Sequence, residues 1–127
     1  MILCDTNIFI EVYKSNPDII SNLKSIGSDN LAVSIITKTE LYFGARNKKE
    51  LAAIKAQLQH CECFSLGAKE CSIFIRLMES YSLSHKPSIP DMLIAATALT
   101  HDLELYTLNI KDFSFIPDLT IRPIAIT

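Results

Sequence analysis

Residues 90–99 read Pro90-Asp91-Met92-Leu93-Ile94-Ala95-Ala96-Thr97-Ala98-Leu99, and the rest of the chain is interpreted around them. Apolar side chains cover almost every side of a helix drawn through this stretch, which is typical of a helix buried in a protein core. Pro90 suits the first turn of a helix, where a backbone N–H group is not needed. Asp91 is the only charge, and a carboxylate in a first turn offsets the helix dipole by roughly 0.3–1 kcal/mol. The stretch therefore predicts a buried helix with one acidic side chain at its start.

The chain has 127 residues, of which 49% are hydrophobic and 20% charged, and its formal net charge is −2. This length allows one sizeable core and is too short for two, so we expect a single domain over residues 1–127. The charge gives no overall basic surface, so any contact with nucleic acid must come from local Lys and Arg side chains or from a metal ion. Residues 1–5 lack the basic segment of a signal peptide, and no apolar run reaches the length of a membrane span. We therefore expect a cytoplasmic protein without membrane contact.

Four cysteines lie at positions 4, 61, 63 and 71. Their spacing matches neither the paired cysteines of zinc sites nor the density of a secreted disulfide framework. A metal group made of His60, Cys61, Cys63 and Cys71 stays open as an alternative. Buried, reduced thiols are the commoner outcome for such residues.

Short apolar runs alternate with helical periodicity along the chain. Buried strands are expected at residues 1–5, 31–35, 61–66 and 103–107, followed by a last strand at 119–126 that Pro123 restricts to the sheet edge. Helices are expected at 6–14, from Pro17 to a C-terminal cap at Gly27, from 37, at 48–59, at 67–83 and from 90. This alternation predicts an α/β fold in which helices cover both faces of a central, mostly parallel sheet.

Four acidic residues fall at one edge of the predicted sheet. Asp5 follows the first strand, Glu40 lies in the first helical turn after the second, and Asp112 follows the fourth. Asp91 reaches the same edge because its helix runs antiparallel to the strand that follows it. Ligand sites lie beyond the carboxyl ends of parallel strands, so these four are candidate catalytic and metal-binding residues. Structural roles stay open as well, because Thr37 to Glu40 fit a helix capping box and Asp91 suits a helix start.

Four carboxylates gathered without a counterion raise one another's pKa values, which costs stability, and a divalent cation removes this conflict. Carboxylate oxygens are the ligands that Mg²⁺ or Mn²⁺ prefers. Such an ion can generate the nucleophile from bound water and stabilise the charge that grows on a phosphate during phosphodiester hydrolysis. Thr107 and Asn109, at the same edge, are suited to orienting an acid or the water, and turn chemistry explains them equally well. The local candidates for phosphate contact are Lys38, Arg46, Lys86 and Lys111.

Several motifs of the chain resemble those of PIN-domain ribonucleases, and most closely those of the VapC-like toxins of type II toxin–antitoxin systems. The matching stretches are Leu3-Cys4-Asp5-Thr6-Asn7, Ser34 to Leu41 with Gly44-Ala45, Asp91 to Leu99, and Thr107-Leu108-Asn109 with Asp112-Phe113. They occur in the family's order and span nearly the whole chain. The resemblance implies a three-layer α/β/α PIN-like fold, one PIN domain over residues 1–127 and an endoribonuclease that depends on Mg²⁺, with Mn²⁺ as the alternative ion.

The resemblance also implies roles for individual residues. The metal-binding acids would be Asp5, Glu40, Asp91 and Asp112, and the supporting polar residues Thr6, Asn7, Thr107 and Asn109. Family members cleave RNA, commonly form homodimers and are inhibited by a cognate antitoxin that covers a hydrophobic groove near the acids. Residues suited to such a groove, or equally to the core, are Ile8, Phe9, Val12, Leu41, Tyr42 and Phe43. Many relatives carry a further acid beside Asp91, where this chain has Pro90 and Met92, so the numbers of acids and of metal ions stay open.

Other functions compatible with the sequence are a PIN nuclease of RNA processing that is not a toxin, and a catalytically inactive scaffold that binds RNA or a partner. A phosphoacceptor domain is disfavoured, because Asp5-Thr6-Asn7 lacks the adjacent acids and Cys61 to Leu66 lacks the aspartate that such a domain needs. A nucleotide-binding module is disfavoured because neither glycine-rich phosphate-binding motif occurs.

Overall fold

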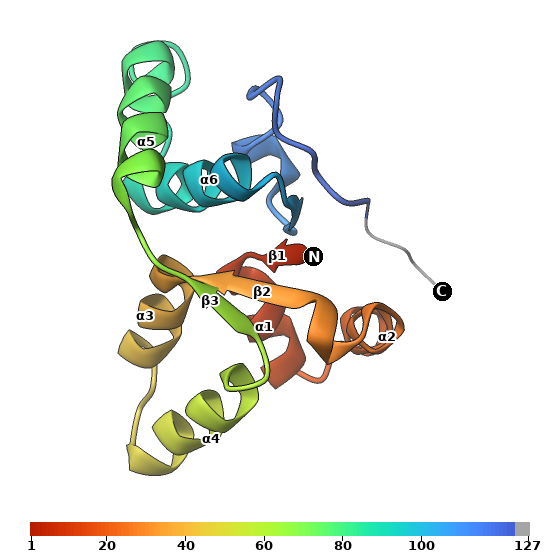
Figure 1. The fold of residues 1–127 in the computed structure, drawn as a ribbon. Helices are drawn as coiled ribbons and strands as arrows, with labels where there is room; N and C mark the ends of the chain where they lie inside the picture. The colour runs from red at the N-terminus through yellow and green to blue at the C-terminus, as the bar shows by residue number, and fades with distance from the viewer. Residues whose placement is uncertain (124–127) are drawn as a thin grey trace.

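The computed structural model describes residues 1–123 and places four parallel strands in one sheet, in the order β3-β2-β1-β4 (Figure 1). In chain order the elements are β1 (Ile2–Cys4), α1 (Thr6–Tyr13), α2 (Pro17–Ile26), the 3-10 helix η1 (Ser28–Asn30), β2 (Leu31–Ser34), α3 (Ile35–Phe43), α4 (Lys48–Leu58), β3 (Glu62–Phe64), α5 (Ala68–Tyr81), α6 (Ile89–His101), β4 (Glu104–Tyr106) and the 3-10 helix η2 (Ile110–Asp112). The predicted central parallel sheet is confirmed.

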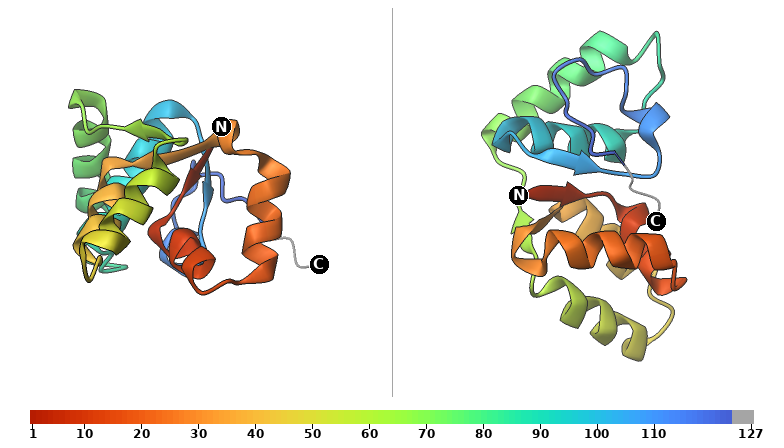
Figure 2. Two further views of the ribbon diagram at one scale, coloured as in Figure 1. Left: turned by 90° about the horizontal axis from the view of Figure 1, so that it is seen from below. Right: turned by 90° about the vertical axis from the view of Figure 1, so that its right-hand side faces the viewer.

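Helices cover both faces of the sheet, which gives the three predicted layers (Figure 2). Successive strand residues point to opposite faces. Leu3 of β1 therefore joins the apolar cluster with α5 and α6, whereas Cys4 joins the cluster with α1, α2 and α4. The same alternation in β4 sends Leu105 to the first cluster and Tyr106 to the second. All residues of β1 and β2 are buried, which explains why these two strands read as continuous apolar runs.

The predicted buried helix is α6, whose residues Met92 and Ile94 to Ala98 are buried. It begins at Ile89, because the hydroxyl of Ser88 accepts a hydrogen bond of 3.1 Å from the backbone N–H of Asp91. This places Asp91 in the first turn, as predicted, with its carboxylate at the start of an otherwise apolar helix.

The start of α3 differs from the prediction. The helix begins at Ile35, and its N-cap is Ser34, whose hydroxyl accepts a hydrogen bond from the N–H of Thr37 at 3.1 Å. Thr37 therefore lies inside the helix, with its side chain buried, and Glu40 lies one turn further on. The capping box that the sequence left open for Thr37 to Glu40 does not form, so helix capping does not explain the Glu40 carboxylate.

The predicted strand at 119–126 is reduced, within the described residues, to a single bridge between Ile121 and Leu105 of β4. Leu105 donates its N–H to the carbonyl of Thr120 and accepts a bond from the N–H of Arg122, both at 2.8 Å. Pro123 has no N–H to extend this pairing, as expected at a sheet edge. Residues 124–126 of the predicted strand lie outside the described part of the chain.

The cysteines do not converge on a common point. Cys61 and Cys63 pack with Cys4 in the apolar cluster beside α1 and α4, whereas Cys71 is exposed on α5. Within residues 1–123 no helix is long and apolar enough to cross a lipid bilayer.

Candidate active site at the carboxyl edge of the sheet

Asp5 lies at the junction of β1 and α1 and is only 4% exposed. Its Oδ1 accepts a hydrogen bond of 2.8 Å from the N–H of Thr6, so the carboxylate caps the helix. Its Oδ2 accepts a bond of 2.8 Å from the hydroxyl of Thr107 and lies 3.4 Å from the amide nitrogen of Asn7. Because both carboxylate oxygens have donors, the orientation of this buried acid is fixed.

Thr107 directly follows β4, is fully buried, and forms hydrogen bonds both with Asp5 and with the loop after β4. Its oxygen accepts a bond of 3.0 Å from the backbone N–H of Asn109 while its proton goes to Asp5. The side-chain oxygen of Asn7 accepts the N–H of Leu108 at 3.3 Å. Thr107 and Asn7 thus hold the segment after β4 against the start of α1. The side chain of Asn109 is exposed, and its part in this network is played by its backbone amide.

Glu40 is brought to Asp5 by Thr6, the first residue of α1. The hydroxyl of Thr6 donates a hydrogen bond of 2.7 Å to Oε1 of Glu40 and lies 3.2 Å from the hydroxyl oxygen of Thr37. An ionised carboxylate can only accept, so the single hydroxyl proton of Thr6 goes to Glu40. The two neighbours Asp5 and Thr6 therefore join β1, α1 and α3 at one point.

Asp91 and Asp112 complete the group of acids that the sequence predicts for this edge. Asp91 is partly buried at the start of α6, and Asp112 is exposed at the end of η2. Their interactions show that the four acids share one region. Asp91 and Glu40 both raise the pKa of Asp5 by charge repulsion, and Asp112 and Glu40 do the same to Asp91.

Burial is the largest cause of the raised pKa of Asp5, and the bonds from Thr107 and Thr6 oppose it by stabilising the charged form. Burial also raises the pKa of Asp91 most strongly, and a side-chain hydrogen bond between Ser88 and the carboxylate opposes it. The surroundings of both acids thus disfavour the charged form relative to water, and a nearby positive charge would favour it. Ser88 was not predicted as a site residue, although a serine three positions before an acid at a helix start is a recognisable capping pattern.

The donor set is made of carboxylate oxygens alone, which fits Mg²⁺ or Mn²⁺ and not zinc. As the side chains are placed, no three His, Cys, Asp or Glu residues in the described chain converge closely enough to hold one ion together. Hydrogen bonds fix Asp5, whereas Asp112 is exposed, and Glu40 is exposed and held by the hydroxyl of Thr6. The ligand types therefore suit a divalent cation. To bind one together, the exposed acids would have to move toward Asp5.

A groove of about 450 Å³ opens beside Glu40, between α1, α3 and α4. Its apolar lining comes mainly from Ile10, Tyr13, Leu41, Ala53 and Ile54, with polar groups from Thr6, Glu40, Arg46 and Glu50. Of the six residues that the sequence suggests for a groove, Ile8 and Phe9 are core residues, Val12 and Tyr42 pack against that core, Leu41 lines the groove and Phe43 is exposed. Ile10 and Tyr13 were missed, although their spacing on α1 places them together on its outer face.

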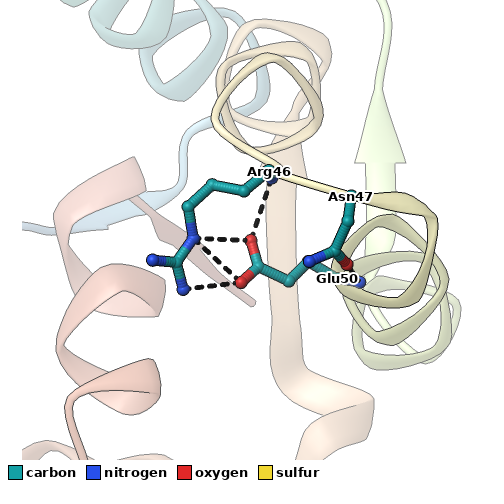
Figure 3. A network of polar contacts seen from close by, with 3 residues as sticks. All are labelled: Arg46, Asn47 and Glu50. Carbon is teal, nitrogen blue, oxygen red and sulfur yellow. Dashed lines mark hydrogen bonds and ion pairs between the residues drawn. The ribbon is translucent and has the colours of Figure 1, made fainter.

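Arg46 and Glu50 form a network on the side of the groove next to α4 (Figure 3). The guanidinium of Arg46 contacts both carboxylate oxygens of Glu50: Nη2 donates to Oε2 at 2.7 Å, and Nε lies 3.0 Å from Oε2 and 3.2 Å from Oε1. Asn47 caps the same helix by accepting the N–H of Glu50 at 2.8 Å. Among the predicted phosphate contacts, Arg46 is therefore engaged with Glu50, Lys38 lies over the ring of Tyr42, and Lys86 and Lys111 are exposed.

A family model described as the PIN domain matches residues 2–116, which includes all four acids. Ribonuclease VapC19 of Mycobacterium tuberculosis is 32% identical over 122 residues, an alignment that covers 94% of this chain and 97% of the relative. The chain belongs to the PIN-domain family of VapC ribonucleases.

Solved structures agree with this assignment. A toxin–antitoxin complex from Klebsiella pneumoniae contains a chain with a TM-score of 0.81 and 29% identity, covering 94% of this PIN domain chain and 96% of its own. A crystal structure of VapBC2 from Rickettsia felis, bound to a DNA fragment from its promoter, gives a TM-score of 0.81 and 28% identity, with 96% and 98% covered. Both the predicted fold and the predicted family are thereby confirmed.

Proposed function

We propose that this protein is a Mg²⁺-dependent endoribonuclease that acts as the toxin of a toxin–antitoxin pair. The observation that carries the proposal is the fixed, buried Asp5, whose raised pKa reflects burial and the nearby charges of Asp91 and Glu40. Such a group of acids costs stability unless a cation binds to it. The curated relatives are named ribonucleases, and the solved neighbours are toxin–antitoxin complexes.

The metal-binding residues would be Asp5, Glu40, Asp91 and Asp112, with Mn²⁺ able to replace Mg²⁺. When bound, the ion supplies a hydroxide nucleophile from water and stabilises charge on the phosphate. The chain's own polar residues prepare this site. Thr107 and the N–H of Thr6 hold Asp5 in one orientation, and the hydroxyl of Thr6 holds Glu40 beside it. Asn7 and the backbone amide of Asn109 act one step further away, by fixing Thr107 and the loop that carries it.

The groove beside Glu40 is the surface we assign to a cognate antitoxin, since it joins apolar side chains to the acids. We expect RNA as the substrate, since the curated relatives are named ribonucleases, and a homodimer by analogy with the family. A nuclease of this kind would act in the cytoplasm, where its RNA substrates are found.

Cleavage of total cellular RNA by the purified protein tests the proposal, with Mg²⁺ present or removed by EDTA. Two variants address the site: Asp5→Asn removes the buried charge, and Glu40→Gln removes an exposed charge with little risk to folding. Asp29→Asn is the matched control, because Asp29 is an exposed acid in η1, before β2 and thus at the opposite edge of the sheet. We expect cleavage that is lost with EDTA and in both site variants, and kept in the control. Cleavage that survives these changes would disprove the assignment, and an inactive folded protein would favour an RNA- or partner-binding scaffold.

A further inference from the structure

Phe43 is the most exposed large apolar side chain in the described structure, with 94% of its surface accessible. It is the last residue of α3, the helix that carries Glu40. Residues three or four apart on a helix lie on the same face, so Ile36, Glu40 and Phe43 form one row along α3. The aromatic ring therefore stands one helical turn beyond an acid of the candidate active site.

The same row shows which way the ring faces. Ile36 packs against the apolar cluster that includes α6, so this side of α3 faces the helix that carries Asp91. Glu40 continues the row, accepts the hydroxyl of Thr6 and lies close enough to Asp91 to raise its pKa. Phe43 follows in the same row, one helical turn beyond Glu40.

The surroundings of the ring are polar. The other exposed residues on this part of α3 and just after it are Thr39, Glu40 and Gly44, so the ring is not part of a continuous apolar patch on this helix. Phe43 does not line the apolar groove that we assign to the antitoxin, and the exposed Thr39 lies beside it, so a protein partner that buried Phe43 would find little other apolar surface there. A nucleobase needs only an aromatic face, and its phosphates are negatively charged groups that belong near a metal site.

We infer that Phe43 is a stacking platform for an unpaired nucleobase next to the phosphodiester bond that the acids cleave. The inference rests on the proposed ribonuclease function and adds a substrate-positioning residue to it. Proteins that recognise single-stranded RNA stack splayed bases on exposed aromatic side chains, and this stacking tolerates any base because every base has a π-face. Phe43 is thus a binding and positioning residue rather than part of the chemistry.

Stacking can be measured without any cleavage, because the chain contains no tryptophan. Phe43→Trp introduces a single indole, whose emission is quenched when a base stacks on it. The titration uses metal-free protein in EDTA with a single-stranded oligoribonucleotide of mixed sequence, and then with the same strand in a duplex. Leu83→Trp is the matched control, since Leu83 is 91% exposed in the loop after α5. We expect quenching of the first variant by the single strand only, and no quenching of the second.

Cleavage kinetics test the positioning role in the presence of Mg²⁺. Phe43→Ala is expected to raise KM about 10-fold, which corresponds to about 1.4 kcal/mol, with kcat within about twofold of the wild type. Phe43→Tyr keeps an aromatic face and should restore KM, whereas Phe43→Leu keeps an apolar side chain without one and should behave like the alanine variant. Because the side chain is exposed, all three variants should unfold at the wild-type temperature, so lost activity would not reflect lost folding.

The two experiments separate this inference from the function on which it rests. If the single strand quenches Phe43→Trp although the wild-type protein cleaves no RNA, the result would support the stacking site and count against the nuclease. Normal cleavage in Phe43→Ala together with no quenching in Phe43→Trp would overturn the stacking site and leave the nuclease standing. If the molecular mass in solution shows a dimer for wild type and Phe43→Leu but a monomer for Phe43→Ala, Phe43 contacts a second copy of the chain. That result would also overturn the inference.

Discussion

The hydroxyl of Thr107 donates a hydrogen bond of 2.8 Å to Oδ2 of Asp5, and so joins residues 102 positions apart in the chain. Both side chains are buried, and the same threonine oxygen accepts the N–H of Asn109. One hydroxyl group therefore stabilises the ionised form of Asp5 and holds the loop after β4. This double role makes Thr107 the residue through which the sheet edge and the acids are coupled.

Thr107→Val keeps the shape of the side chain and removes both hydrogen bonds. The N–H of Asn109 and the buried carboxylate oxygen of Asp5 each lose a partner, so the free energy of unfolding should fall by about 1–3 kcal/mol. Because the lost bond lowers the pKa of Asp5, that pKa should rise further in the variant. Urea denaturation measures the first effect, and the acid limb of the pH profile of RNA cleavage measures the second. Thr107→Ser retains the hydroxyl and should keep most of the stability, whereas a valine variant as stable as wild type would contradict this role.

Glu40→Gln separates charge from hydrogen bonding at the second acid. The glutamine carbonyl can still accept the Thr6 hydroxyl, and Glu40 is exposed, so the fold should be unaffected. RNA cleavage should nevertheless fall by about 100-fold or more, as expected when charge stabilisation of about 3 kcal/mol is lost from a metal site. Single-turnover kinetics measure the loss of RNA cleavage, and a thermal melt checks that the fold is unaffected. A glutamine variant with near wild-type activity would remove Glu40 from the metal site.

Asp91→Asn should stabilise the metal-free protein at neutral pH. Burial and repulsion from Asp112 and Glu40 raise the pKa of Asp91, so the folded chain binds a proton there more tightly than the unfolded chain does. The stability of metal-free wild type therefore falls as the pH rises from 3.8, the ordinary value, through the raised pKa. The asparagine variant lacks this dependence. Since Asp91 is only partly buried, we expect a gain of about 2 °C in the melting temperature at pH 7.

Melting curves in EDTA across the acid range measure this effect. The gain of Asp91→Asn over wild type should shrink toward zero as the pH falls to about the ordinary aspartate value. Asp29→Asn is the control for a general change in net charge. An advantage of Asp91→Asn that is the same at all pH values would mean that charge repulsion is not its cause.

Two contacts in the network beside the groove should differ in their effect on stability. Asn47→Ala removes the N-cap of α4, and this should lower the free energy of unfolding by about 0.5–2 kcal/mol. Arg46→Ala removes an ion pair whose arginine side chain is 84% exposed, so the free energy of unfolding should not change measurably. Denaturant unfolding of the two variants side by side provides the comparison, and the opposite order would show that the ion pair, rather than the cap, holds this helix start.

The sequence predicts the layers and the position of the acids because these depend on local patterns. Apolar runs mark β1 and β2, and parallel strands bring their carboxyl ends to one edge. Asp5 and Asp91 are then placed by the ends of the elements next to them, and Gly27, with φ of +86°, ends α2 where predicted. Such features need no knowledge of distant contacts.

The errors occur where several local patterns compete or where tertiary packing decides. Ser34 and Thr37 can both cap a helix, and the buried end of β2 selects Ser34. The groove and the exposed ring of Phe43 depend on how α1, α3 and α4 pack, which apolar spacing cannot reveal. The convergence of Thr6 on Glu40 is likewise a contact across 34 residues.

Calorimetric titration of Mn²⁺ into the metal-free protein tests most directly whether the four acids form a metal site. We predict binding to wild type, with affinity reduced at least about 10-fold in Asp91→Asn and Glu40→Gln and unchanged in Asp29→Asn. No binding to the folded wild-type protein, or equal binding to a variant that lacks both the Asp91 and the Glu40 charges, would contradict the metal site at this edge of the sheet.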